Sequence, residues 1–141
     1  MGKIQVFLDT DVIISGLLSK TGAAFEIIKH PAVKKTISKA VKREIVTVTK
    51  RLKIRSHKSK ALVKDMSVVA LELTKSRLTK DYQRFVSDRQ DCHVVAGAKA
   101  SKSGFLLTHN LKHYQVDKIK TDLGIMVLKP GNFLQYLRSL S

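Results

Sequence analysis

Residues 4–18, IQVFLDTDVIISGLL, carry the strongest indication of the fold. Residues 4–8 form an apolar run that only Gln5 interrupts, and a run of this length predicts a buried strand. Asp9 follows at once, so its carboxylate is expected at the C-terminal end of that strand. The apolar residues 12–14 can then begin a helix, for which Thr10 or Asp11 is a suitable N-cap.

Strands and helices continue to alternate along the rest of the chain. Further strands are predicted at residues 36–38, 105–107 and 125–128. Further helices are predicted at residues 23–29, at residues 91–102, where Gly104 would end the helix, and from Pro130 onward. Another helix is predicted to begin at the cap Ser38, with one apolar face formed by Val41, Ile45, Val48 and Leu52. A long helix is predicted over residues 58–73, with an apolar stripe formed by Leu62, Met66, Val69 and Leu73. Residues 75–88 are the least readable part, where Tyr82, Phe85 and Val86 fit either a short strand or a packed loop.

Alternating strands and helices predict a parallel sheet with helices on both of its faces. We therefore expect an α/β fold, a three-layer α/β/α sandwich with a mainly parallel sheet of about four to five strands. With 141 residues, 43% of them hydrophobic, and no linker or repeat, the chain fits one domain over residues 1–141.

The composition is strongly basic, with 27 Lys and Arg against 11 Asp and Glu and a formal net charge of +16. This charge favours a polyanionic partner such as nucleic acid. Aromatic residues are scarce at 6%, with no Trp, so the charge is better explained by attraction to phosphate than by base stacking. No apolar run is long enough to span a bilayer, so no membrane partner is expected. The single cysteine, Cys92, favours a reducing cytoplasm.

Because acidic residues are rare here, those at predicted strand and helix ends call for an explanation. Asp9 and Asn110 each follow a strand, Asp91 opens a helix, and Glu44 is the single acid between Lys34 and Lys64. Three carboxylates and an amide oxygen that converge at the C-terminal edge of a parallel sheet would suit Mg²⁺ or Mn²⁺.

Each of these residues also has a simpler interpretation. Asp9 could be a helix cap after a strand, and Asn110 could belong to an ordinary turn. Glu44 could be a solvated residue that pairs with Lys42 or Lys50, and Asp91 could be a first-turn acid in competition with Asp88. His113 is more often a loop histidine than a catalytic one.

The chain resembles the PIN domain family, the metal-dependent ribonuclease fold used by toxins of type II toxin–antitoxin modules. The similarity spans nearly the whole chain in the family's order and spacing. It is carried by five pieces: residues 6–18 (VFLDTDVIISGLL), residues 38–44, residues 91–98 (DCHVVAGA), the run from Leu106 to Tyr114, and residues 130–134.

The resemblance implies roles for five residues. Asp9, Glu44 and Asp91 would be the three metal-binding acids, Asn110 would take the fourth position, and Thr108 would steady the site. The activity implied is that of a Mg²⁺- or Mn²⁺-dependent endoribonuclease that needs no side-chain nucleophile. By the same analogy its partners would be RNA, a cognate antitoxin and a second copy of the chain, in the cytoplasm.

Asp11 departs from the family's pattern, because it stands where Asn is usual. The extra charge beside Asp9 could tighten metal binding, or neighbouring carboxylates could raise the pKa of Asp11. Two other functions stay open on the sequence: a PIN-like protein that binds RNA or ribosomes without cleaving, and a basic interaction module whose acids are only caps.

Overall fold

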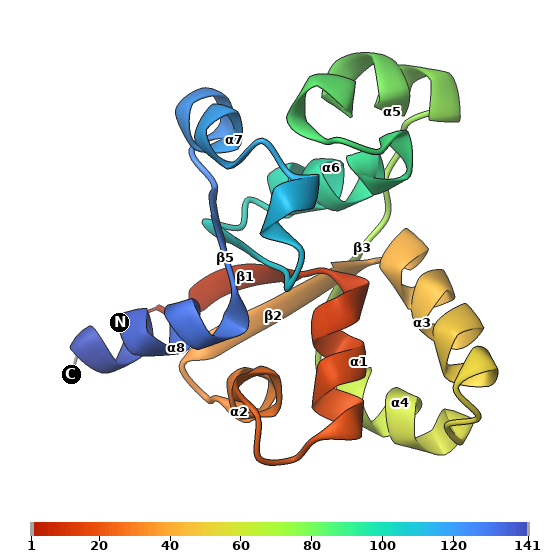
Figure 1. The fold of residues 1–141 in the computed structure, drawn as a ribbon, viewed down its shortest axis with the longest axis vertical. Coiled ribbons are helices and arrows are strands. Elements are labelled where there is room, and N and C mark those ends of the chain that lie inside the picture. The colour runs from red at the N-terminus through yellow and green to blue at the C-terminus, as the bar shows by residue number, and fades with distance from the viewer. Residues whose placement is uncertain (1, 141) are drawn as a thin grey trace.

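A computed structural model describes residues 2–140 and shows strands and helices in alternation (Figure 1). The strands are β1 (Ile4–Leu8), β2 (Val33–Ser38), β3 (Ser67–Val69), β4 (Phe105–Leu107) and β5 (Met126–Leu128). The helices are α1 (Thr10–Leu18), α2 (Ala23–Lys29), α3 (Lys39–Arg51), α4 (Ser56–Val63), α5 (Lys75–Tyr82), α6 (Cys92–Ala100), α7 (Val116–Leu123) and α8 (Pro130–Ser139). Short 3₁₀ turns lie at Gln83–Phe85, Arg89–Asp91 and Leu111–His113.

The five strands form one parallel sheet in the order β3-β2-β1-β4-β5. The central strand β1 pairs with β2 on one side and with β4 on the other, so Phe7 lies opposite both Thr36 and Leu106. After β1 the chain adds β2 and β3 on one side, then crosses over to add β4 and β5 on the other. The strand order therefore reverses between β1 and β4, the place where open parallel sheets form a crevice at their C-terminal ends.

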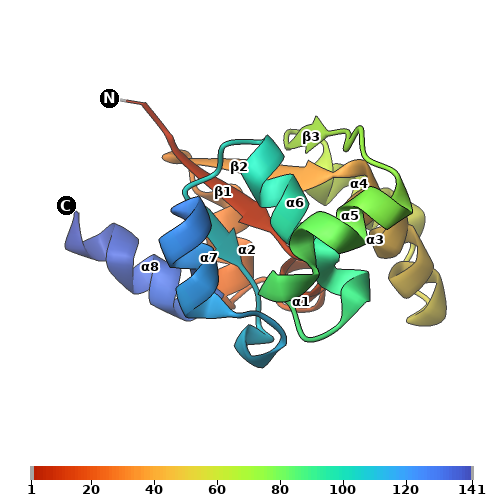
Figure 2. The ribbon, with the colours of Figure 1, turned by 90° about the horizontal axis from the view of Figure 1, so that it is seen from above.

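Helices cover both faces of the sheet, as expected for a three-layer α/β/α sandwich. Figure 1 shows α1, α2, α3, α4 and α8 on one side of the sheet and α5, α6 and α7 on the other. Figure 2 looks onto the second layer, where α6 lies over the central strands. None of the helices in residues 2–140 is long and apolar enough to cross a membrane.

Gly97 allows α6 to pack closely against the sheet. A Cβ built on Gly97 would lie 2.5 Å from Cζ of Phe7, a ring that is fully buried in the core. Since the ring has no free space to move into, a larger residue at position 97 would push α6 outward. The position of α6 matters for the site, because Asp91 directly precedes this helix.

Several predicted elements are confirmed, notably the strands at 4–8 and 105–107 and the helix at 23–29. Other details differ. The N-cap of α1 is Asp9 itself, the helix predicted to reach residue 102 ends at Ala100, and Lys102 rather than Gly104 takes a left-handed conformation with φ of 58°. On α3 the buried face is Val41, Ile45 and Thr49, while Leu52 is 46% exposed.

The helix predicted over residues 58–73 is wrong. α4 ends at Val63, and β3 (Ser67–Val69) pairs in parallel with β2. Residues 62, 66, 69 and 73 are spaced like the apolar face of a helix, but they do not form one. The β-branched residues Val68 and Val69 instead pair with the edge of β2 and form a strand. The helices α5 and α7 were not predicted, because α5 has no fully buried residue and α7 only Ile119.

Candidate active site

A cleft of about 950 Å³ opens at the C-terminal ends of the central strands. Asp9, Glu44, Asp91 and Asn110, the four residues predicted as metal ligands, all line this cleft. Thr108, the fifth predicted residue, is completely buried beside them at the end of β4. The topology therefore brings together residues that lie up to 101 positions apart, counted from Asp9 to Asn110.

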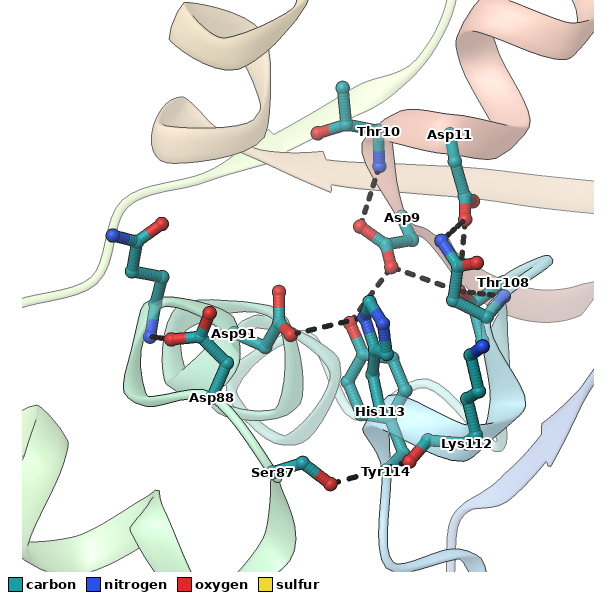
Figure 3. Close-up of polar contacts among 12 residues, drawn as sticks. Asp9, Thr10, Asp11, Ser87, Asp88, Asp91, Thr108, Lys112, His113 and Tyr114 are labelled. Carbon is teal, nitrogen blue, oxygen red and sulfur yellow. Dashed lines mark hydrogen bonds and ion pairs between the residues drawn. The ribbon is translucent and has the colours of Figure 1, made fainter.

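Asp9 is held in place from two directions. Its Oδ1 accepts a hydrogen bond from the backbone N–H of Thr10 at 2.8 Å, so Asp9 caps α1. Its Oδ2 accepts from Oγ1 of Thr108 at 3.0 Å and from the hydroxyl of Tyr114 at 2.8 Å (Figure 3). Burial first, and then the charge of Asp9, raise the pKa of Tyr114, which keeps this phenol protonated as a donor. Asp9 is therefore a helix cap, as its simpler interpretation predicted. The cap uses Oδ1 alone, while Oδ2 is held by Thr108 and Tyr114.

Asp11 holds the turn after β4. It accepts hydrogen bonds from the backbone N–H of His109 at 3.2 Å and from Nδ2 of Asn110 at 2.9 Å. A longer contact of 3.3 Å comes from Oγ1 of Thr108. Since an ionised carboxylate only accepts, the amide of Asn110 turns its nitrogen toward Asp11 and leaves its oxygen available. Burial, followed by the charge of Asp9, raises the pKa of Asp11 to about 6. The sequence predicted the contribution of a neighbouring carboxylate but not the larger one of burial.

Glu44 reaches the cleft from α3 and is held by two donors. Its Oε1 accepts from Oγ1 of Thr10 at 2.8 Å and lies 3.3 Å from Nε2 of His93. Burial alone would raise the pKa of Glu44, but the hydrogen bond and charge of His93 and the bond from Thr10 hold it below its usual value. Nδ1 of His93 is buried without a hydrogen-bond partner among the described residues. Glu44 therefore does not pair with Lys42 or Lys50.

Asp91 faces Asp9 from the opposite wall, at the end of the Arg89–Asp91 turn. Its Oδ2 lies 3.6 Å from Nδ1 of His113. Burial, and next the charge of Asp9, raise the pKa of Asp91, although His113 opposes the shift. The competing acid, Asp88, instead caps the turn by accepting from the backbone N–H of Gln90 at 2.9 Å, and it does not line the cleft.

The cleft contains carboxylate and amide oxygens, the type of donor that hard divalent ions prefer. In residues 2–140 no three His, Cys, Asp or Glu side chains stand close enough to chelate one in the arrangement seen. Yet the pKa values of Asp11 and Asp91 are both raised by burial and by the charge of Asp9, although the chain as a whole carries a large positive charge. A cation among these carboxylates would remove that repulsion, and oxygen donors are the ligands that Mg²⁺ and Mn²⁺ prefer.

Four residues that contact the predicted acids were given no role at the site from the sequence. Tyr114 binds Asp9, while Thr10 and His93 bind Glu44. His113 contacts Asp91, although the sequence favoured a loop role for it. The only available signal was that Thr10 and His93 lie one and two positions from predicted acids.

We expect Asp11→Asn to stabilise the protein without metal at neutral pH. The pKa of Asp11 is about 6 in the folded state against 3.8 for an ordinary carboxyl, so the folded state binds more protons between these values. The wild type therefore loses stability as the pH rises through this window, by roughly 1 to 2 kcal/mol after allowance for partial solvation. Urea unfolding in EDTA from pH 4 to 8 measures this, and a difference between variant and wild type that does not change with pH would contradict it.

Comparisons with known proteins agree with this fold. The sequence profile of the PIN domain matches residues 5–112. No curated protein sequence matches the chain.

Solved structures share the fold at low sequence identity. A chain of VapBC2 from Rickettsia felis, bound to a DNA fragment from its promoter, superposes with a TM-score of 0.61 at 13% identity, covering 89% of this chain and 98% of that one. A toxin–antitoxin complex from Klebsiella pneumoniae gives 0.66 at 17% identity, with coverages of 89% and 97%. A protein of Pyrobaculum aerophilum gives 0.61 at 14% identity, with 96% of each chain covered.

Proposed function

Because the chain belongs to the PIN domain family, whose members are typically nucleases, we propose that it is a metal-dependent endoribonuclease. The reaction would be hydrolysis of RNA phosphodiester bonds with Mg²⁺ or Mn²⁺. The observation that carries the proposal is the position of Asp9, which Thr108 and Tyr114 hold beside Asp11 and Asp91 in a cleft of a strongly basic chain. Like charges kept together in this way favour a site built for a cation.

Some residues of the cleft would hold the metal ion, and others would position these ligands. Asp9, Glu44, Asp91 and the free amide oxygen of Asn110 are the proposed ligands. A divalent ion bound there would activate a water molecule and neutralise charge on the phosphodiester. Thr108 and Tyr114 keep Asp9 from rotating.

The proposed ligands Glu44 and Asn110 are also held by neighbouring side chains. His93 and Thr10 hold Glu44, and Asp11 orients Asn110. Because ligand orientation depends on such neighbours, their loss is expected to weaken metal binding.

The proposed biological role is that of the toxin in a toxin–antitoxin pair. Support comes from the fold, which is shared with chains of two toxin–antitoxin complexes along almost their whole length. We propose that a small antitoxin protein inhibits the chain by covering the cleft, and that the chain itself forms a homodimer. The buried thiol of Cys92, which has no other cysteine to pair with, is consistent with action in the cytoplasm.

The direct test is cleavage of unstructured RNA by the purified chain. We expect cleavage with Mn²⁺ or Mg²⁺ and none with EDTA, because the carboxylates alone repel the phosphodiester and activate no water. Products are resolved on denaturing gels. RNA that is bound but stays intact at every metal concentration would instead favour the alternative of an inactive PIN-like protein that binds RNA or ribosomes.

A further inference from the structure

The chain stays extended beyond the part of β3 that pairs with β2. Side chains of residues 67–72 alternate between partly buried and exposed, which is the period of a strand, although only Ser67–Val69 pairs with β2. Within the part of the chain that the structure describes, residues 70–73 form no backbone hydrogen bond. β3 is the outermost strand on its side of the sheet and lies at the margin of the molecule in Figure 2. Residues 67–73, the β3 edge, are therefore an unpaired strand edge.

The β3 edge lacks the side chains that usually protect such strands. Lysine or proline on an edge strand normally keeps it from pairing with another chain. The opposite edge has both, because β5 is followed at once by Lys129 and by Pro130, where α8 begins. Residues 66–74 (MSVVALELT) contain no Lys, Arg or Pro and one acid, Glu72, in a chain with 27 Lys and Arg. Two chains of the same large positive charge can therefore meet at the β3 edge without bringing basic side chains face to face.

We propose that two copies of the chain pair antiparallel through their β3 edges and join their sheets into one continuous sheet. The inference rests on the homodimer proposed above and names its interface. Overlap along the whole edge, a contact about 24 Å long, places Ala70 opposite Ala70 of the second copy. In this register Val69 faces Leu71 of the second copy and Val68 faces Glu72. Apolar side chains therefore meet, and no like charges stand opposite each other.

The symmetry of this pairing limits the assembly to two copies. A two-fold interface uses the same surface on both chains, so each β3 edge fills the other and no third chain can add to it. The backbone groups of residues 70–73 gain the hydrogen-bond partners that they lack in the single chain. Because the paired strands run in opposite directions, the clefts of the two copies open at opposite ends of the joined sheet, and neither covers the other.

The first test adds one positive charge at the β3 edge or elsewhere on the surface. Ala70→Lys places like charges directly opposite each other at the centre of the pairing. Ala100→Lys adds the same charge at an exposed alanine at the end of α6 and is the matched control. Sedimentation equilibrium over a range of concentrations measures the dissociation constant of the dimer for both variants and the wild type. Melting temperatures confirm that both variants fold.

We expect Ala100→Lys to dimerise like the wild type and Ala70→Lys to dimerise at least about tenfold more weakly. A wild-type dimer that Ala70→Lys leaves unchanged would overturn the interface and keep the homodimer. A wild type that is monomeric at every concentration would overturn the homodimer and the interface together. Neither result bears on the proposed ribonuclease activity, which has its own test.

The second test uses a disulfide to check the register. Opposed Cα atoms of antiparallel strands lie about 4.5 to 5.5 Å apart, a separation that a disulfide can bridge. With oxidised glutathione, Ala70→Cys should form a disulfide-linked dimer at least about tenfold faster than Ala100→Cys, because pairing holds its two thiols together. Cys92 is buried and takes no part. Equal rates of dimer formation in the two variants would overturn the proposed pairing.

Discussion

Asp9→Asn is expected to lower metal-stimulated RNA cleavage by at least about a hundredfold. The substitution keeps the size of the side chain, and its remaining oxygen can still accept from the backbone N–H of Thr10. The variant lacks the negative charge of the Asp9 carboxylate, which hydrogen bonds from Thr108 and Tyr114 hold in the cleft. Rates are measured on a labelled RNA at saturating Mn²⁺.

A second measurement separates loss of the metal from loss of the fold. In EDTA, Asp9→Asn should melt no lower than the wild type, because removing one of three neighbouring carboxylates relieves their repulsion. The rise in melting temperature that Mn²⁺ produces in the wild type should be absent from the variant. Asp65→Asn makes the same chemical change at an exposed site outside the cleft and should behave as the wild type in both assays. Cleavage by Asp9→Asn at the wild-type rate would contradict the role proposed for Asp9.

Gly97→Ala is expected to lower the free energy of unfolding by roughly 2 kcal/mol. The new Cβ would lie 2.5 Å from the buried ring of Phe7, so α6 or the central strand must move. Denaturation in urea measures this decrease. Gly131→Ala is the matched control, because no atom lies within 4 Å of a Cβ there and α8 tolerates alanine well.

A double-mutant cycle tests the cause of that decrease. Phe7→Leu shortens the ring side chain, so combining it with Gly97→Ala should cost less than the sum of the two single changes. Strictly additive effects would show that the contact between Gly97 and Phe7 is not what limits the packing of α6. If α6 shifts, Asp91 shifts with it, and Gly97→Ala should therefore also weaken Mn²⁺ binding.

The sequence predicted the elements that have a complete local pattern. The strand of residues 4–8 and the helix of residues 23–29 are bounded by strong signals, and each buries a regular set of apolar side chains. β3 was missed because three residues at the sheet edge owe their conformation to pairing with β2 rather than to their own period. α5 and α7 were missed because shallow packing leaves almost no fully buried residue to mark their periodicity.

The cleft, too, could be predicted from the sequence only in part. The order of residues already indicated which side chains could form a site, because scarce acids stand at strand and helix ends of a basic chain with a parallel α/β pattern. Their hydrogen-bond partners follow from the folded arrangement, which places Tyr114 on Asp9, His93 on Glu44 and Asp11 on Asn110. These contacts join residues 49 to 105 positions apart, and such distant partners leave no mark on the local periodicity of either segment. They exist because the sheet reverses its strand order beside β1, which brings the ends of distant segments to one place.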